Sequence, residues 1–107
     1  MPEEPFVAVH PEHVVLDVGD GAGALVLYTE PGLLGEEIEI SPTGDDHRRT
    51  HQHVLERPTP GQTHHAAVFD HLSAGTYTLW RAGSPYARNV AIASGHVTEL
   101  HWRPRLR

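Results

Sequence analysis

Apolar side chains in this chain recur at every second position rather than at every third or fourth. The alternating sets are Val14 with Leu16 and Val18, Leu25 with Leu27, Ile38 with Ile40, Tyr77 with Leu79, Val90 with Ile92, and Val97 set against Leu100 and Trp102. Successive side chains of a strand point to opposite faces of a sheet, so this period is typical of half-buried strands. Glycine and proline, with ten and nine copies, interrupt the chain between the sets. The pattern predicts seven or eight short antiparallel strands and supports no helix.

These strands are expected to pack as one β-sandwich, because a single open sheet would leave the apolar side chains of one face in water. A chain of 107 residues is of the size of one domain. We expect the sandwich to span residues 13–103, preceded by an extended N-terminal arm at 1–12 that contains Pro2, Pro5 and Pro11. Residues 104–107 form an arginine-rich tail.

Composition excludes several classes of function. The chain has no cysteine, which rules out disulfides, iron–sulfur clusters, thiolate zinc sites and cysteine nucleophiles. The formal charge of -6 at pH 7 argues against nucleic-acid binding, which needs a basic surface. There is no apolar run of about 20 residues, the length needed to span a membrane, and no signal peptide pattern. We therefore expect a soluble, cytoplasmic protein, monomeric or weakly self-associating.

The segment Val68–Trp80 carries the pattern F-x-x-L-x-x-G-x-Y-x-L, made by Phe69, Leu72, Gly75, Tyr77 and Leu79. In this respect it resembles a hairpin of the prealbumin-like sandwiches, which include the carboxypeptidase regulatory-like and Cna B-type domains. The resemblance implies an all-β sandwich in which Phe69 and Leu72 fill the core, Gly75 makes a tight turn, and Tyr77 and Leu79 return on the inward face. The segments 23–28 and 37–40 resemble the paired early strands of the same group.

The whole chain is also similar to short uncharacterised actinobacterial proteins, some of which carry a phospholipase label. No serine here stands in a Gly-x-Ser-x-Gly motif, so no residue pattern supports that label. The Tyr-Arg-Gly-Ser ending of the hydroxyisourate hydrolases is missing, and without lysine the internal isopeptide bond of Cna B-type domains cannot form. The resemblance therefore implies the fold and is nearly silent on activity. A small hydrolase, as the phospholipase label would imply, is a weaker alternative to a binding module.

Ten histidines are the most unusual part of the composition, and four of them flank one predicted turn. His51 and His53 are two apart, so they share one face of a strand. If the turn is Pro58–Gly61, Arg57 pairs with Gln62 and Leu55 with His64, which places His64 on the same face. Phe69 then lies on the opposite, inward face, so the trio His51, His53 and His64 faces solvent. A shift of one residue in the loop would bring in His65 instead.

Three neutral imidazoles with an open fourth position suit Zn²⁺, Ni²⁺ or Cu²⁺, with zinc–nitrogen bonds of about 2.0–2.1 Å. The sequence therefore predicts a small binding or accessory module of unknown partner that coordinates a divalent transition metal through surface histidines. Two other interpretations stay open for the trio, namely ordinary solvated polar residues and pH-dependent association.

A metal-free interaction domain is the main alternative function, and it requires an exposed apolar patch around Leu55, Ala66 and Val68. The charged segment before the histidine strand is most simply a solvated loop. It also contains Arg48 and Arg49, which could receive an anionic partner beside the metal face.

Overall fold

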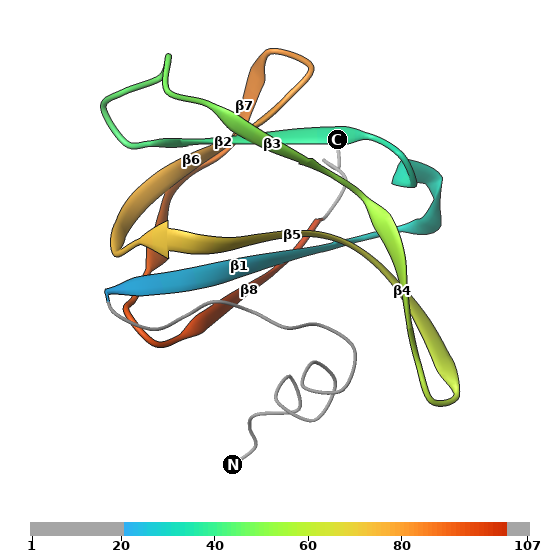
Figure 1. Ribbon diagram of the computed structural model, residues 1–107. Helices are drawn as coiled ribbons and strands as arrows, with labels where there is room; N and C mark the ends of the chain where they lie inside the picture. The colour runs from blue at the N-terminus through green and yellow to red at the C-terminus, as the bar shows by residue number, and fades with distance from the viewer. Residues whose placement is uncertain (1–20, 103–107) are drawn as a thin grey trace.

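The computed structural model describes residues 21–102, which form two facing β-sheets (Figure 1). The strands are β1 (Ala22–Thr29), β2 (Glu37–Pro42), β3 (Thr50–His53), β4 (Leu55–Thr59), β5 (Gln62–Ser73), β6 (Gly75–Arg81), β7 (Ser84–Ile92) and β8 (Val97–His101). One turn of 3₁₀-helix, η1 (Pro31–Leu33), separates β1 from β2. The prediction of an all-β sandwich is confirmed at this level. The expected strand at 14–18, the arm at 1–12 and the tail at 104–107 lie outside the described residues.

Each sheet contains four strands, and one pair in sheet A is parallel rather than antiparallel. Sheet A has the order β4-β5-β1-β8 and sheet B the order β3-β2-β6-β7. The β1 and β8 strands run in the same direction, in a register from Ala24 with Val97 to Tyr28 with His101. The prediction of a purely antiparallel sandwich is therefore wrong for sheet A. Alternation predicts strands but not their direction, and a parallel pair needs only a long crossover connection, which β2 to β7 provide.

The core lies between the inner faces of the two sheets. Sheet A contributes Leu25 and Leu27 from β1 and Phe69 from β5, and sheet B faces them with Ile38, Ile40 and Leu79, among others. The full buried cluster is Leu25, Leu27, Ile38, Ile40, Val54, Ala67, Phe69, Tyr77, Leu79, Val90 and Ile92. Most of these belong to the alternating sets of the sequence. The period of two therefore correctly identified the inward faces.

The segment Val68–Trp80 is not a hairpin, because β5 belongs to sheet A and β6 to sheet B. Gly75, with φ of 153°, lies where the chain passes from one sheet to the other. The Tyr77 hydroxyl donates a hydrogen bond of 2.6 Å to the carbonyl oxygen of Ser73, four residues upstream. This bond resembles the tyrosine corner of other sandwiches. The expected inward positions of Phe69, Tyr77 and Leu79 are correct, but they meet across the core from opposite sheets.

A β-bulge in β5 lets both Phe69 and Leu72 face the core although they are three residues apart. The pairing with β1 shifts between Gly23, opposite Leu72, and Leu25, opposite Phe69. Two steps on β1 thus match three steps on β5, and the extra residue needs an unusual backbone conformation. His71, with φ of 58°, has that conformation.

A second passage between the sheets occurs at Val54, and Figure 1 shows the chain leaving β3 in sheet B to enter β4 in sheet A. The Val54 side chain is fully buried. Its amide donates to the carbonyl of Glu36 at 2.9 Å, and its carbonyl accepts from the amide of Gly35 at 2.8 Å. Both polar backbone groups of the corner are therefore satisfied. The strand predicted to run on from His51 past Leu55 is broken here.

Among the described residues, β4 is an outer strand of sheet A and pairs with β5 alone. Their turn contains two residues, Pro60 and Gly61, because Thr59 pairs with Gln62. Proline presets φ at the first position and Gly61, with φ of 78°, supplies the positive φ of the second. The predicted four-residue turn at Pro58–Gly61 is wrong, since Pro58 lies within the strand opposite Thr63.

At Gly23, β1 approaches the connection between β7 and β8 so closely that only glycine fits. A Cβ atom at Gly23 would overlap the carbonyl oxygen of Ala93 and lie 2.8 Å from Cγ2 of Ile92. We expect Gly23→Ala to lower the free energy of unfolding by about 1–3 kcal/mol, as overpacking of a core does. Urea denaturation measures this value.

Gly32→Ala is the matched control, because a Cβ atom at Gly32 meets nothing within 4 Å. It should change stability by less than about 0.5 kcal/mol or raise it slightly, since alanine restricts the unfolded chain. Equal effects of the two substitutions would show that Gly23 is not the close contact described here.

Candidate functional site

His51 and His53 lie on β3 at the edge of sheet B, on the face turned away from the core. In the register with β2, His53 is opposite Glu37 and His51 is opposite Glu39. The two imidazole rings are edge to face with their centroids 5.8 Å apart. The predicted sharing of one face by these two histidines therefore matches the structure.

His64 lies on β5 in sheet A and does not join that pair. It is opposite Arg57, and His65 is opposite Glu56, so the hairpin register differs from the predicted one. The corner at Val54 sends β3 and β4 into different sheets, so the strand that carries His51 and His53 has no pairing with β5. The structure does not gather the predicted trio. Within residues 21–102, no group of three or more His, Asp or Glu residues is placed to hold a metal ion.

His64 lies next to aromatic side chains and not next to other potential metal ligands from β3. The centroid of its ring lies 5.6 Å from that of Tyr28, and the Tyr28 ring also stacks on that of His101, with the centroids 4.9 Å apart. The Tyr28 hydroxyl donates to Oε2 of Glu99 at 3.3 Å. Burial raises the pKa of Tyr28 far above its ordinary value, and the negative charge of Glu99 and the hydrogen bond to it add to the effect.

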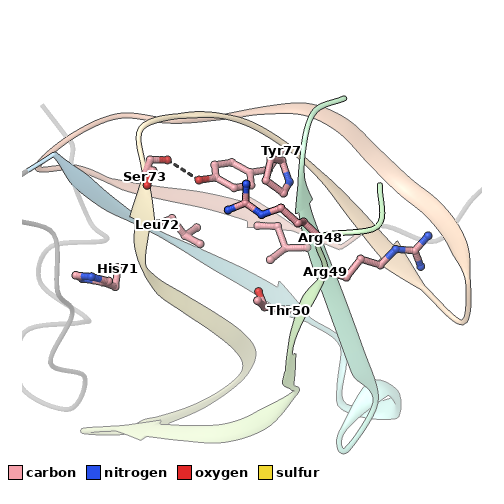
Figure 2. A pocket seen from close by; sticks show the side chains of 9 residues that line it. Arg48, Arg49, Thr50, His71, Leu72, Ser73 and Tyr77 are labelled. Carbon is pink, nitrogen blue, oxygen red and sulfur yellow. Dashed lines mark hydrogen bonds between the residues drawn. The ribbon is translucent and has the colours of Figure 1, made fainter. Parts of the chain in front are cut away.

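A cavity of about 290 Å³ opens where the two sheets diverge (Figure 2). The end of β5 forms one wall, and β2, the start of β6 and the segment entering β3 form the other. The lining residues are Ile40, Pro42, Arg48, Arg49, Thr50, His71, Leu72, Ser73 and Tyr77. They include two arginines and one histidine but no carboxylate, so the cavity carries positive charge next to apolar side chains.

Arg49 is already occupied by contacts within the protein. Its guanidinium donates to Oε1 of Glu39 at 3.2 Å and to the carbonyl oxygen of Asp46 at 2.8 Å. The guanidinium carbon also lies 3.7 Å from the centroid of the Trp80 ring, in a cation–π contact. Figure 2 shows Arg49 extending away from the cavity. This arginine fastens the loop to the outer face of sheet B.

Arg48 is the cation that remains available to a ligand. Its side chain is 76% exposed, and its ion pair with Asp45 is long, at 3.8 Å between Nη1 and Oδ2. Exposed pairs of this kind contribute about 0–1 kcal/mol, so an incoming anion can replace Asp45 at little cost. In Figure 2 the Arg48 guanidinium lies beside Tyr77 and Leu72, at the mouth of the cavity.

Tyr77 and Thr50 add polar groups to this positive end. The Tyr77 hydroxyl donates its hydrogen to the carbonyl oxygen of Ser73. Burial raises the pKa of Tyr77, and the positive charge of Arg48 opposes that rise. Thr50 is exposed and lines the cavity with its hydroxyl. The cavity therefore combines one exposed positive charge with neutral polar groups at the same end.

The apolar patch that a metal-free interaction domain requires is not continuous. Leu55 is 48% exposed, but Ala66 is buried and Val68 half-buried, so the described residues present no continuous patch there.

A small hydrolase would need an accessible nucleophile. The Ser41 hydroxyl is buried and accepts a hydrogen bond of 2.9 Å from the indole of Trp80, which removes it as a nucleophile. Within residues 21–102 no helix has the length and apolar character needed to cross a membrane.

Sequence reasoning had identified Arg48 and Arg49 as possible anion ligands but not the cavity itself. The cavity joins residues 40–50 to residues 71–77. Pro42 and Tyr77 pair within sheet B, whereas residues 71–73 reach them from β5 in sheet A. Comparison adds no assignment, because no family model, curated protein or solved structure matches this chain. The prealbumin-like resemblance therefore stays a prediction.

The raised pKa of Tyr28 leads to a prediction about alkaline stability. Since the folded protein favours the neutral phenol, this contribution is complete below the ordinary tyrosine pKa of 10.0 and is lost as the pH rises above it. We expect the free energy of unfolding to fall above about pH 10, and to fall less steeply in Tyr28→Phe. Urea denaturation curves at intervals of about half a pH unit, from about pH 8 to about pH 11.5, give the dependence of the free energy of unfolding on pH for both proteins. Identical slopes in the two proteins would contradict the prediction.

Proposed function

We propose that this protein is a small binding module whose ligand is an organic anion with an apolar part. The anionic group would lie against the Arg48 guanidinium at the mouth of the cavity, and the apolar part would lie between Leu72 and Ile40. The observation that carries the proposal is the position of Arg48, which lines a partly apolar cavity and has only a weak, exposed ion pair.

The charge balance of the cavity supports an anion over a cation or a neutral molecule. Its lining contains no carboxylate, although the whole chain carries 14 acidic and eight basic residues. A guanidinium presents several N–H groups in one plane, and carboxylate and phosphate oxygens match this geometry. With Arg49 held by Glu39 and Arg48 only weakly paired with Asp45, one available positive charge remains, which favours a monoanion such as a carboxylate.

The size and walls of the cavity limit the rest of the ligand. Its volume of about 290 Å³ is at the lower end of the pockets that hold small molecules, which range over about 300–1,000 Å³. Leu72 is half-buried and offers apolar surface that a short aliphatic or aromatic group can cover, and Ile40, which is buried, lines the cavity behind it. A metabolite-sized carboxylate fits these limits better than a peptide or nucleotide does.

Binding rather than catalysis follows from the same residues. General acid–base chemistry needs a group that gains and loses a proton near neutral pH. The hydroxyl of Tyr77 has its proton committed to Ser73, and burial raises its pKa. Arginine cannot give up its proton under these conditions. The imidazole of His71 also lines the cavity, but Figure 2 shows it apart from Arg48 and Tyr77. The cavity is therefore equipped to recognise a charge and an apolar group.

The test titrates hexanoate and benzoate into the ¹⁵N-labelled protein and detects binding by two-dimensional NMR. We expect amide shifts centred on residues 48–50 and 72–77, and binding at least about tenfold weaker in Arg48→Gln, which loses a charged hydrogen bond of about 1.5–3 kcal/mol. Arg88→Gln is the control, because it removes the same charge from β7, outside the lining of the cavity.

Two further probes separate the parts of this proposal. Hexanamide has the same chain without the charge and should bind more weakly than hexanoate, and inorganic phosphate tests the charge without the apolar part. If Arg48→Gln and Arg88→Gln bind hexanoate equally, or if hexanamide binds as well as hexanoate, the proposed role of Arg48 is wrong.

A further inference from the structure

We propose that His51 and His53 form a two-imidazole chelate for a divalent transition metal on the outer face of β3. The site is independent of the cavity, because its side chains project from the opposite face of the same strand. It differs from the predicted three-histidine site in that the protein supplies two nitrogen ligands, and water or a partner fills the remaining positions.

The spacing of the rings supports one shared metal ion. With metal–nitrogen bonds of about 2.0–2.1 Å, each ring centre lies about 3.2 Å from the metal, so two rings on one ion have centres roughly 4.5–6.4 Å apart. The observed separation of 5.8 Å is inside this range. The two ring centres are therefore already at a distance that one shared metal ion allows.

The backbone holds the two histidines in a fixed relation. All four residues of β3 pair in register with β2, from Thr50 with Ile40 to His53 with Glu37. The strand ends at the buried corner of Val54, which prevents it from sliding. A rigid strand lowers the entropy cost of bringing both imidazoles to one ion.

The neighbouring charge also favours a cation. Oε2 of Glu37 lies 3.6 Å from Nε2 of His51, and both side chains are more than half exposed, at 51% and 57%. Glu39, opposite His51, is neutralised by Arg49, so Glu37 is the carboxylate that faces the pair. The Glu37 carboxylate would attract a divalent ion bound between the imidazoles. The His51–Glu37 contact that the ion would replace contributes little, because both side chains are exposed.

Imidazole ligands define the class of metal. They suit Cu²⁺, Ni²⁺ and Zn²⁺, whereas Mg²⁺ and Ca²⁺ prefer oxygen ligands. For a site of this kind the affinity order should follow the general one, with Cu²⁺ tightest. We therefore expect Cu²⁺ to bind more tightly than Ni²⁺ and Zn²⁺, and Mg²⁺ to give no response.

A variant that keeps the composition tests the chelate directly. Gln52→His/His53→Gln retains ten histidines but places the two imidazoles of β3 on opposite faces of the strand, since neighbours on a strand point in opposite directions. Position 52 is exposed, so the new side chain has room. We expect binding of Ni²⁺, measured by isothermal titration, to weaken at least about tenfold, the equivalent of about 1.4 kcal/mol.

Two double variants control for the other histidines. His51→Ala/His53→Ala and His47→Ala/His96→Ala each leave eight, and His47 and His96 are exposed residues outside β3. Only His51→Ala/His53→Ala should lose Ni²⁺ binding at the proposed chelate. Circular dichroism checks that each variant is folded. Unchanged Ni²⁺ binding in the rearranged variant, or equal losses in the two double variants, would overturn the proposal.

Discussion

The burial of Val54 at the corner between β3 and β4 is the contact on which the arrangement of both candidate sites depends. A fully buried valine with both backbone groups hydrogen-bonded fixes the point where the chain leaves sheet B for sheet A. On one side of that point, β3 presents Thr50 toward the cavity and His51 and His53 away from the core. On the other side, β4 pairs with β5 and carries Arg57 to His64. One side chain thus separates groups that are close in the sequence.

This corner explains how far the sequence could predict the fold. Among residues 21–102, alternation correctly predicted most strands and most inward residues, because burial of one face imposes a period of two regardless of topology. It could not show that Val54 turns the chain or that β1 and β8 are parallel, since both depend on contacts between distant segments. The F-x-x-L spacing did contain a signal of the bulge at His71, because two core residues three apart cannot both face inward on a regular strand.

The candidate sites were predicted in part, for similar reasons. The three-histidine prediction assumed one continuous hairpin with a four-residue turn, whereas the turn is Pro60–Gly61 and the hairpin starts after Val54. The pair of His51 and His53 was predictable because it requires only one strand. Arg48 and Arg49 look alike in the sequence, and only the Trp80 ring and the Glu39 carboxylate distinguish them. Which of two adjacent arginines is available to a ligand is decided by tertiary contacts.

The position of Pro58 in β4 has a consequence for the behaviour of the protein in concentrated solution. An outer strand exposes unpaired backbone groups, and another molecule can add a strand to them and begin a fibril. Proline lacks the amide hydrogen that such an addition would use, so it interrupts the row of donors along this edge of sheet A. At the edge of sheet B, the polar and charged side chains around β3 hinder the same growth. The open sandwich therefore carries its own protection against aggregation at both of these strands.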